Sequence, residues 1–469
     1  MKNRIAEKWQ VITSGIAIVT LLLLPGLSCA QNKTPAYERW GITKPVKDNA
    51  VEQQLATTYN FFYNLKFDTA KVIYQQILKK FPNSAEVHLG LSMVERYAGN
   101  LSDAVTECQK ALALDPASVG VQINYADLLA PYRGAKMKEP LTDSARYALS
   151  ISYYEKALSS NHPLAAYAHI GLFGAYLIGM GDLAQARQQL IELGKKDYFP
   201  PMLKEYAHNL LASVQPDAIL FTQGDNDTYP LLSLQEYDGV RKDVSVVNIN
   251  LLNVPKLVVL MRDSLKVPIS YTDSALKTIE SRYDTIKHKV ILMRDFVIAN
   301  IIENGRQQNI PVYFSTTVAR ENMAGFKDNL VLEGIVYRVI GVKAKDSSDI
   351  DRVINNVTEK YRFDHIGQKE VWISNLSPIT RNVAGLGVNY LSAYNLMAEF
   401  YKKGEKRVTI LEGVETPDVT KINNDLREKD VMIDKMQHQI LDLQTKINSI
   451  NNDSISELLK TLVLANKKH

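Results

Sequence analysis

Residues 218–250 alternate between two hydrophobic patterns. An apolar, β-branched run at 218–221 ends in a polar turn at 222–227, a helical stretch follows from 228 to about 237, and a second apolar run covers 244–249. Two strands joined by one helix predict a parallel βαβ unit, because a parallel return needs a crossover of about a dozen residues.

We therefore predict an α/β domain with a parallel sheet over residues 216–404. Its next strand is expected at 311–316, and residues 330–342 read as one strand or paired strands, rich in β-branched residues and broken by Gly334. Residues 273–288 are polar and read as irregular. Further helices are expected at 254–265, 290–304 and 378–402.

The first half of the chain is helical and repeats itself. Residues 51–84 align with residues 85–118 at a spacing of 34 positions. The aligned pairs are Ala70 with Ala104, Tyr74 with Cys108, and Pro82 with Pro116. A small residue where two helices cross, a larger one four positions later and a closing proline are typical of tetratricopeptide repeats.

Two more units complete the predicted array, which spans residues 51–212. The third runs from 119 to about 163 and contains an insert at 130–142; the fourth starts near 167, with Gly174 and Ala186 at the expected positions. Stacked repeats curve into a concave surface. We expect this groove to bind a protein or peptide, and a purely structural array is the alternative.

Residues 1–29 have the pattern of an export signal. Lys2, Arg4 and Lys8 precede an apolar segment at 16–24, which is too short for a comfortable membrane span. Cleavage before Cys29 gives a lipoprotein with Cys29 lipidated, and cleavage after Ala30 is the alternative. Either way we expect an exported protein, in the periplasm or at the outer membrane, held at the membrane by a lipid anchor if Cys29 is modified.

Residues 30–50 are polar, contain two prolines and are interpreted as a linker. Within it, Tyr37 and Trp40 are candidates to dock on the first helix. The second cysteine of the chain, Cys108, is interpreted as a small buried hydrophobe. The net charge is +4, with Lys and Arg scattered among nearly as many acids, which argues against a nucleic-acid surface.

The last long helix is predicted to open at Pro417 and to form a coiled coil over residues 417–452. Its apolar positions between 422 and 450 follow steps of four and three. A homo-oligomer formed through residues 422–450 is the functional interpretation, and a helix folded back on its own domain is the alternative.

Candidate chemistry gathers where the predicted strands end. If the strands at 218, 244 and 311 are parallel neighbours, their carboxyl ends meet at one crevice, where ligands of such sheets bind. The candidate ligand-binding residues are Asp225, Asn226, Asp227, Asn248, Asn250, Thr316, Thr317 and Arg320. They suit a divalent cation held by Asp225 and Asp227, or a sugar's hydroxyl groups. The competing interpretation is local, because Asp and Asn also cap helices and stabilise turns.

Other catalytic motifs are missing from the sequence, which has no GxSxG, HExxH, Walker or GxGxxG pattern. Catalytic residues therefore stay unassigned. We expect Glu333 and Arg338 to pair within the fold rather than to reach the crevice.

The run GDNDTYPL and the blocks LQEYDGVRKDVSVVNINLLN, IPVYFSTTV and LVLEGIVYRVI carry a resemblance. They are similar to the soluble C-terminal region of multi-spanning membrane proteins of Bacteroidota that are related to a protein O-mannosyltransferase. The resemblance covers roughly residues 205–400 and includes no counterpart of the multi-spanning portion. It therefore implies a related α/β domain but no transferase activity.

Together these patterns predict an α+α/β protein, with an all-helical tetratricopeptide array, a parallel-sheet α/β domain and a C-terminal coiled-coil helix. The leading hypothesis is an exported, non-enzymatic, protein-binding scaffold of the cell envelope. The alternatives are a carbohydrate-related or metal-dependent enzyme, or a saccharide-binding module, that uses the crevice at Asp225 and Asp227.

Overall fold

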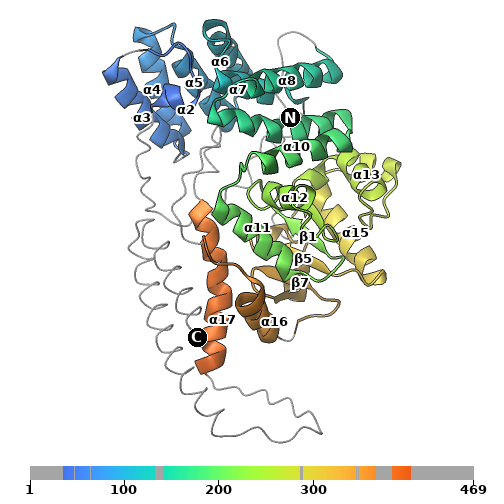
Figure 1. The fold of residues 1–469 in the computed structure, drawn as a ribbon. Coiled ribbons are helices and arrows are strands. Elements are labelled where there is room, and N and C mark those ends of the chain that lie inside the picture. The colour runs from blue at the N-terminus through green and yellow to red at the C-terminus, as the bar shows by residue number, and fades with distance from the viewer. Residues whose placement is uncertain are drawn as a thin grey trace, which may run out of the picture.

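The structure is a computed structural model that describes residues 35–46, 48–63, 65–131, 141–285, 289–344, 346, 348–365 and 383–402. The repeat helices form the upper part of the molecule in Figure 1, and the sheet with its covering helices lies below them. The predicted α+α/β class is confirmed. The export signal and the predicted coiled coil lie outside the described residues.

Antiparallel helix pairs build the array. After the short α2 (Ala36–Arg39), the first three pairs are α3 (Asn49–Tyr63) with α4 (Phe67–Lys80), α5 (Ala85–Ala98) with α6 (Leu101–Leu114), and α7 (Val119–Leu129) with α8 (Asp143–Leu158). The aligned Ala70 and Ala104 have no exposed surface, as crossing positions require. Ser84 and Ser118, also 34 positions apart, cap α5 and α7 by accepting the N–H of Val87 and Val121 at 3.3 Å each.

The fourth pair is less regular. Its first arm comprises the 3-10 turn η3 (Pro163–Tyr167), α9 (Ala168–Gly174) and the π-helical η4 (Ala175–Met180), and its second arm is α10 (Leu183–Lys195). Within the described residues, Pro163–Met180 is the one helix apolar and long enough to cross a membrane, and 67% of it is buried in the protein. Its burial against α8 and α10 explains its apolar character as repeat core.

A mixed sheet forms the centre of the second half. Among the described residues its order is β2-β1-β5-β7-β6. The strands are β1 (Ile219–Thr222), β2 (Ser245–Asn248), β5 (Val312–Ser315), β6 (Leu330–Leu332) and β7 (Val336–Val339). β1 pairs in parallel with β2 and β5, as predicted, whereas β7 pairs antiparallel with both β5 and β6.

The expectation of a parallel sheet is therefore correct for β2, β1 and β5 only. β6 and β7 form a hairpin, because Gly334 adopts a φ of +96°, a conformation that favours glycine and reverses the chain within a few residues. Glu333 in the same turn is buried and pairs with Arg338, which confirms the expected internal ion pair.

Helices cover the sheet on both sides and join it to the array. They are α11 (Pro201–Ser213), α12 (Tyr229–Glu236), α13 (Pro255–Asp263), α15 (Met293–Gln307), α16 (Ile350–Asn355) and α17 (Leu391–Lys402), with 3-10 or π-helical turns η5 (Leu251–Asn253), η6 (Arg320–Asn322), η7 (Phe326–Asn329), η8 (Asn356–Lys360) and η10 (Val383–Tyr390). The segment expected to be irregular instead contains α14 (Asp273–Thr278) and β3 (Arg282–Asp284), which pairs with β4 (Lys289–Ile291). These elements are short and polar, so their periodicity is weak.

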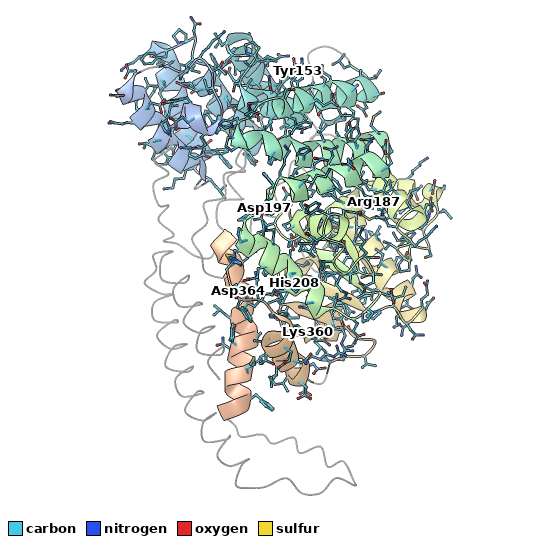
Figure 2. All side chains as sticks on the ribbon, viewed as in Figure 1. Tyr153, Arg187, Asp197, His208, Lys360 and Asp364 are labelled. Carbon is cyan, nitrogen blue, oxygen red and sulfur yellow. The ribbon has the colours of Figure 1, made fainter. Side chains whose placement is uncertain are left out.

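The array and the α/β domain share one hydrophobic core. Apolar residues of the repeats and of α11, α12 and α17 belong to the same buried cluster. Phe173 of α9 packs edge-on against Tyr229 at the start of α12, with ring centroids 5.5 Å apart. Arg187 of α10, labelled in Figure 2, pairs with Glu236 of α12 at 3.1 Å. The α/β domain thus continues the stack where the fourth repeat ends.

Candidate functional site

The turn after β1 is built by its own backbone. Gly224 has a φ of +99°, which permits the chain to reverse, and the carbonyl oxygen of Asp225 accepts the N–H of Thr228 at 3.3 Å and of Tyr229 at 3.0 Å. Pro230 then stands in the first turn of α12, where its missing N–H costs nothing. The local sequence therefore folds into a tight strand-to-helix connection.

Asp227 is buried at the centre of this turn, with 2% of its surface exposed. Its carboxylate accepts the N–H of Gln223 at 3.0 Å and the hydroxyl of Thr317, which follows β5. Burial raises the pKa of the Asp227 carboxyl to about 7, and the nearby charge of Asp225 acts in the same direction. Asp227 thus ties the ends of two neighbouring parallel strands together.

Asn248 makes the equivalent link to β2. Its side-chain N–H groups donate to the hydroxyl of Thr228 at 3.1 Å and to the carbonyl of Gly224 at 3.4 Å, and its side-chain oxygen accepts the N–H of Asn250 at 2.9 Å. The predicted convergence of Asp227, Asn248 and Thr317 is therefore present in the structure.

A buried arginine lies beside this cluster. Arg294, in the first turn of α15, is 5% exposed and donates to the side-chain oxygens of Asn250 at 2.9 Å and Asn322 at 2.6 Å. Asn322 in turn donates to the side-chain oxygen of Gln223 at 3.1 Å. Burial lowers the pKa of the Arg294 guanidinium. Sequence reasoning missed Gln223, Arg294 and Asn322. A basic residue beside the apolar run of α15 was a usable signal for Arg294.

The remaining candidates do not join the cluster. The hydroxyl of Thr316 donates to the carbonyl of Ile335 at 3.0 Å, toward the β6–β7 hairpin. Arg320 is exposed and its guanidinium lies 5.7 Å from the ring centre of Tyr337. Asn226 is half-buried, and Asp225 is the exposed carboxylate of the turn.

The arrangement uses most of its polar groups internally. Asp227 accepts two hydrogen bonds, and the side-chain oxygens of Asn248 and Asn250 accept N–H groups, one of them from a guanidinium. Within the ranges that the structure describes, no three His, Cys, Asp or Glu side chains gather as metal ligands would. This donor set does not fit a divalent cation well, and the sequence-based metal site at Asp225 and Asp227 stays a prediction.

A second candidate site lies on the array, where the described part of the predicted linker, residues 35–46, crosses the first helices of the repeats. Trp40 is 1% exposed and contacts Tyr59 of α3 edge-on, with ring centroids 5.6 Å apart. A Cβ added to Gly120 of α7 would lie 3.0 Å from the Cβ of Trp40 and 3.2 Å from a methyl group of Leu89 of α5. Trp40 therefore sits against the first and third repeats, and the expected docking on the first helix is present.

The backbone of this segment is held by hydrogen bonds from the array. The carbonyl of Trp40 accepts the N–H of Gly120 at 2.8 Å. The N–H groups of Thr43 and Lys44 donate to the Asp115 carboxylate at 2.6 and 3.2 Å, and that of Val46 donates to Glu86 at 3.1 Å. The repeats thus bind a stretch of polypeptide supplied by their own chain, which comprises the helical turn α2 and the residues after it. We call residues 35–46 the docked segment and the surface that holds it the repeat groove.

The structure joins an array of tetratricopeptide-type helix pairs to a mixed-sheet α/β domain. Residues 59–119 match the family model described as tetratricopeptide repeat. Residues 203–283 and 265–357 match the model described as TMEM260-associated domain 2, which covers the crevice and its surrounding strands. None of the curated proteins matches the chain. The chain therefore contains tetratricopeptide repeats, a class that binds proteins or peptides, and a TMEM260-associated region in its C-terminal half.

Proposed function

We propose that the protein is an exported scaffold of the cell envelope that binds a protein or peptide partner on its tetratricopeptide array and performs no chemistry of its own. The observation that carries this proposal is the repeat groove, where side chains and N–H groups of successive repeats already hold a segment of chain by its backbone. Recognition of backbone groups by fixed polar groups is a general mode of peptide binding.

Export and lipid attachment at Cys29 form part of the same proposal. They are supported by the basic start and the apolar segment of residues 1–29. Fractionation of cells that produce the wild type and Cys29→Ala tests them. We expect the wild type in the membrane fraction and the variant in the soluble envelope fraction; wild-type protein in the cytosol would contradict export.

The non-enzymatic part rests on the crevice. The buried side chains of the crevice, Asp227, Asn248 and Arg294, form hydrogen bonds with residues of neighbouring loops. They therefore hold strand ends together rather than face a substrate. Among the described residues of the crevice, Asp225 is the exposed carboxylate. Asp225→Asn therefore removes the exposed carboxylate of the turn and leaves the backbone hydrogen bonds of the turn in place.

One experiment separates the scaffold from the enzyme. Partners are cross-linked in cells and counted by mass spectrometry for the wild type, Asp225→Asn and Gly120→Phe, which fills the repeat groove. The scaffold predicts that Gly120→Phe loses both the partner and the cellular phenotype, and that Asp225→Asn keeps both. Loss of the phenotype in Asp225→Asn, with its partner retained, would refute the proposal in favour of crevice chemistry.

Self-association through residues 422–450 belongs to the proposal as well. Sedimentation of the full chain beside a chain ending at Lys402 tests it, and an unchanged oligomeric state would contradict it.

A further inference from the structure

The docked segment has the character of a bound ligand. Within it, Arg39, Trp40 and Ile42 are 3%, 1% and 6% exposed, so it is held as tightly as a core element. Its partners lie far away in sequence, since Thr43 reaches Asp115 and the carbonyl of Glu38 lies 2.6 Å from the ring nitrogen Nε2 of His162. The segment is thus held by residues of several repeats at once.

The receptor side carries polar groups that serve this segment. Asp115 and Glu86 have no exposed surface, and the hydrogen bonds of their carboxylates reach Thr43, Lys44 and Val46. Buried carboxylates are costly in a repeat core unless they are hydrogen-bonded. Their presence in the array is explained if the groove reads the N–H groups of a docked chain.

One of these carboxylates is only half used. The Oε1 atom of Glu86 accepts the N–H of Val46 at 3.1 Å, whereas its Oε2 atom is buried and accepts no hydrogen bond. The docked segment therefore leaves one buried oxygen of Glu86 without a hydrogen bond.

The side-chain pockets define the pattern of the ligand. The guanidinium of Arg39 stacks on the ring of Tyr59, 3.6 Å from its centre, and Trp40 fills the space left by the missing side chain of Gly120. Gly41 follows with a φ of +57°, and a Cβ there would lie 3.2 Å from the ring of His162. The groove therefore selects a basic residue, a large aromatic residue and a glycine in succession.

We propose that the docked segment is a resident ligand of the repeat groove, and that a partner binds by presenting a basic–aromatic–glycine turn that takes its place. In the resident segment, Arg39 ends α2, and Trp40 and Gly41 form the turn that follows it. This inference rests on the proposed scaffold function and names the chemistry of the partner.

A peptide-binding measurement on the full mature chain tests the inference. A fluorescent peptide with the sequence of residues 33–48 is titrated with the wild type, with Trp40→Ala and with Trp40→Ala combined with Asp115→Asn. In the wild type the tethered segment competes at an effective concentration of about millimolar, so we expect little binding. Trp40→Ala weakens the resident segment and should bind the peptide, and the added Asp115→Asn should reduce the affinity by about tenfold or more.

Two controls make each outcome decisive. A peptide in which alanine replaces the tryptophan should not bind Trp40→Ala, and circular dichroism should show an unchanged helix content for this variant. A folded Trp40→Ala that binds no peptide would overturn the inference, and so would a Trp40→Ala that loses its repeat helices, because the segment would then be a core element. Partners that still cross-link to the array in cells would leave the scaffold proposal standing in either case.

Discussion

Replacing Asp227 by asparagine tests the account of the turn after β1. Asp227 is 2% exposed, and burial raises the pKa of its carboxyl from 3.8 to about 7. Asparagine has nearly the same shape. Its side-chain oxygen can accept the N–H of Gln223 and its NH₂ group can donate to the hydroxyl of Thr317. The variant thus keeps the contacts and removes the ionisation.

The raised pKa fixes the sign of the pH dependence. The folded protein binds the Asp227 proton more tightly than the unfolded chain, so the stabilisation is full at low pH and is lost as the pH rises through about 7. With pKa values of 3.8 unfolded and about 7 folded, the shift amounts to about 4 kcal/mol, of which about 1 kcal/mol falls between pH 6 and pH 8.

Urea denaturation at pH 6 and pH 8, followed by circular dichroism, measures this difference. We expect the free energy of unfolding of the wild type to fall by about 1 kcal/mol more than that of Asp227→Asn. Glu86, whose pKa burial raises to about 7, titrates in the same range but contributes equally to both proteins. Asp225→Asn, on the exposed side of the same turn, is the matched control and should keep most of the wild-type pH dependence, because the charge of Asp225 is a minor cause of the raised pKa of Asp227. Equal pH dependence in the wild type and Asp227→Asn would refute the reasoning.

One reagent and two substitutions test the packing of the array and of its junction with the α/β domain. Cys108 is fully buried, and burial raises the pKa of its thiol to about 12. Iodoacetamide at pH 8 should therefore label Cys108 only in urea. A carbamidomethyl group found on Cys108 of the native protein by mass spectrometry would contradict this. Gly171→Ala places a Cβ 2.1 Å from the ring of Tyr154 and should cost about 1–3 kcal/mol in a thermal melt, and an unchanged melting temperature would contradict the packing described. Arg241→Lys loses a guanidinium that donates to three carbonyl oxygens at and just after the end of α11 and pairs with Asp243, so we expect about 1–3 kcal/mol of destabilisation, and a variant as stable as the wild type would refute this role.

The repeats and the first three strands were predictable because their causes are local. Crossing helices need a small residue at a fixed spacing, as Ala70 and Ala104 show, and parallel strands need an intervening helix such as α12. The convergence of Asp227 and Thr317 followed from the strand order alone. The antiparallel half of the sheet did not, because the same β-branched run suits either direction of pairing.

The contacts that sequence patterns missed are those between distant residues. Residues 30–50 are polar and contain prolines, so they read as a linker, yet Trp40 is buried by Gly120, which lies 80 positions further on. Arg294 is likewise placed by two asparagines that belong to other loops. No local periodicity contains that information.

In the proposed lipoprotein, the docking of residues 35–46 also sets how far the array extends from the membrane. With Cys29 as a lipid anchor, the chain from Cys29 to Pro35 spans at most roughly 20 Å, so the array is confined to the lipid surface and meets partners in that plane. Release of the segment lengthens the connection between Cys29 and α3 to at most roughly 70 Å. The occupant of the repeat groove therefore sets the length of the tether between Cys29 and the array. A partner that displaces the docked segment also increases the distance from the anchor that the array can reach.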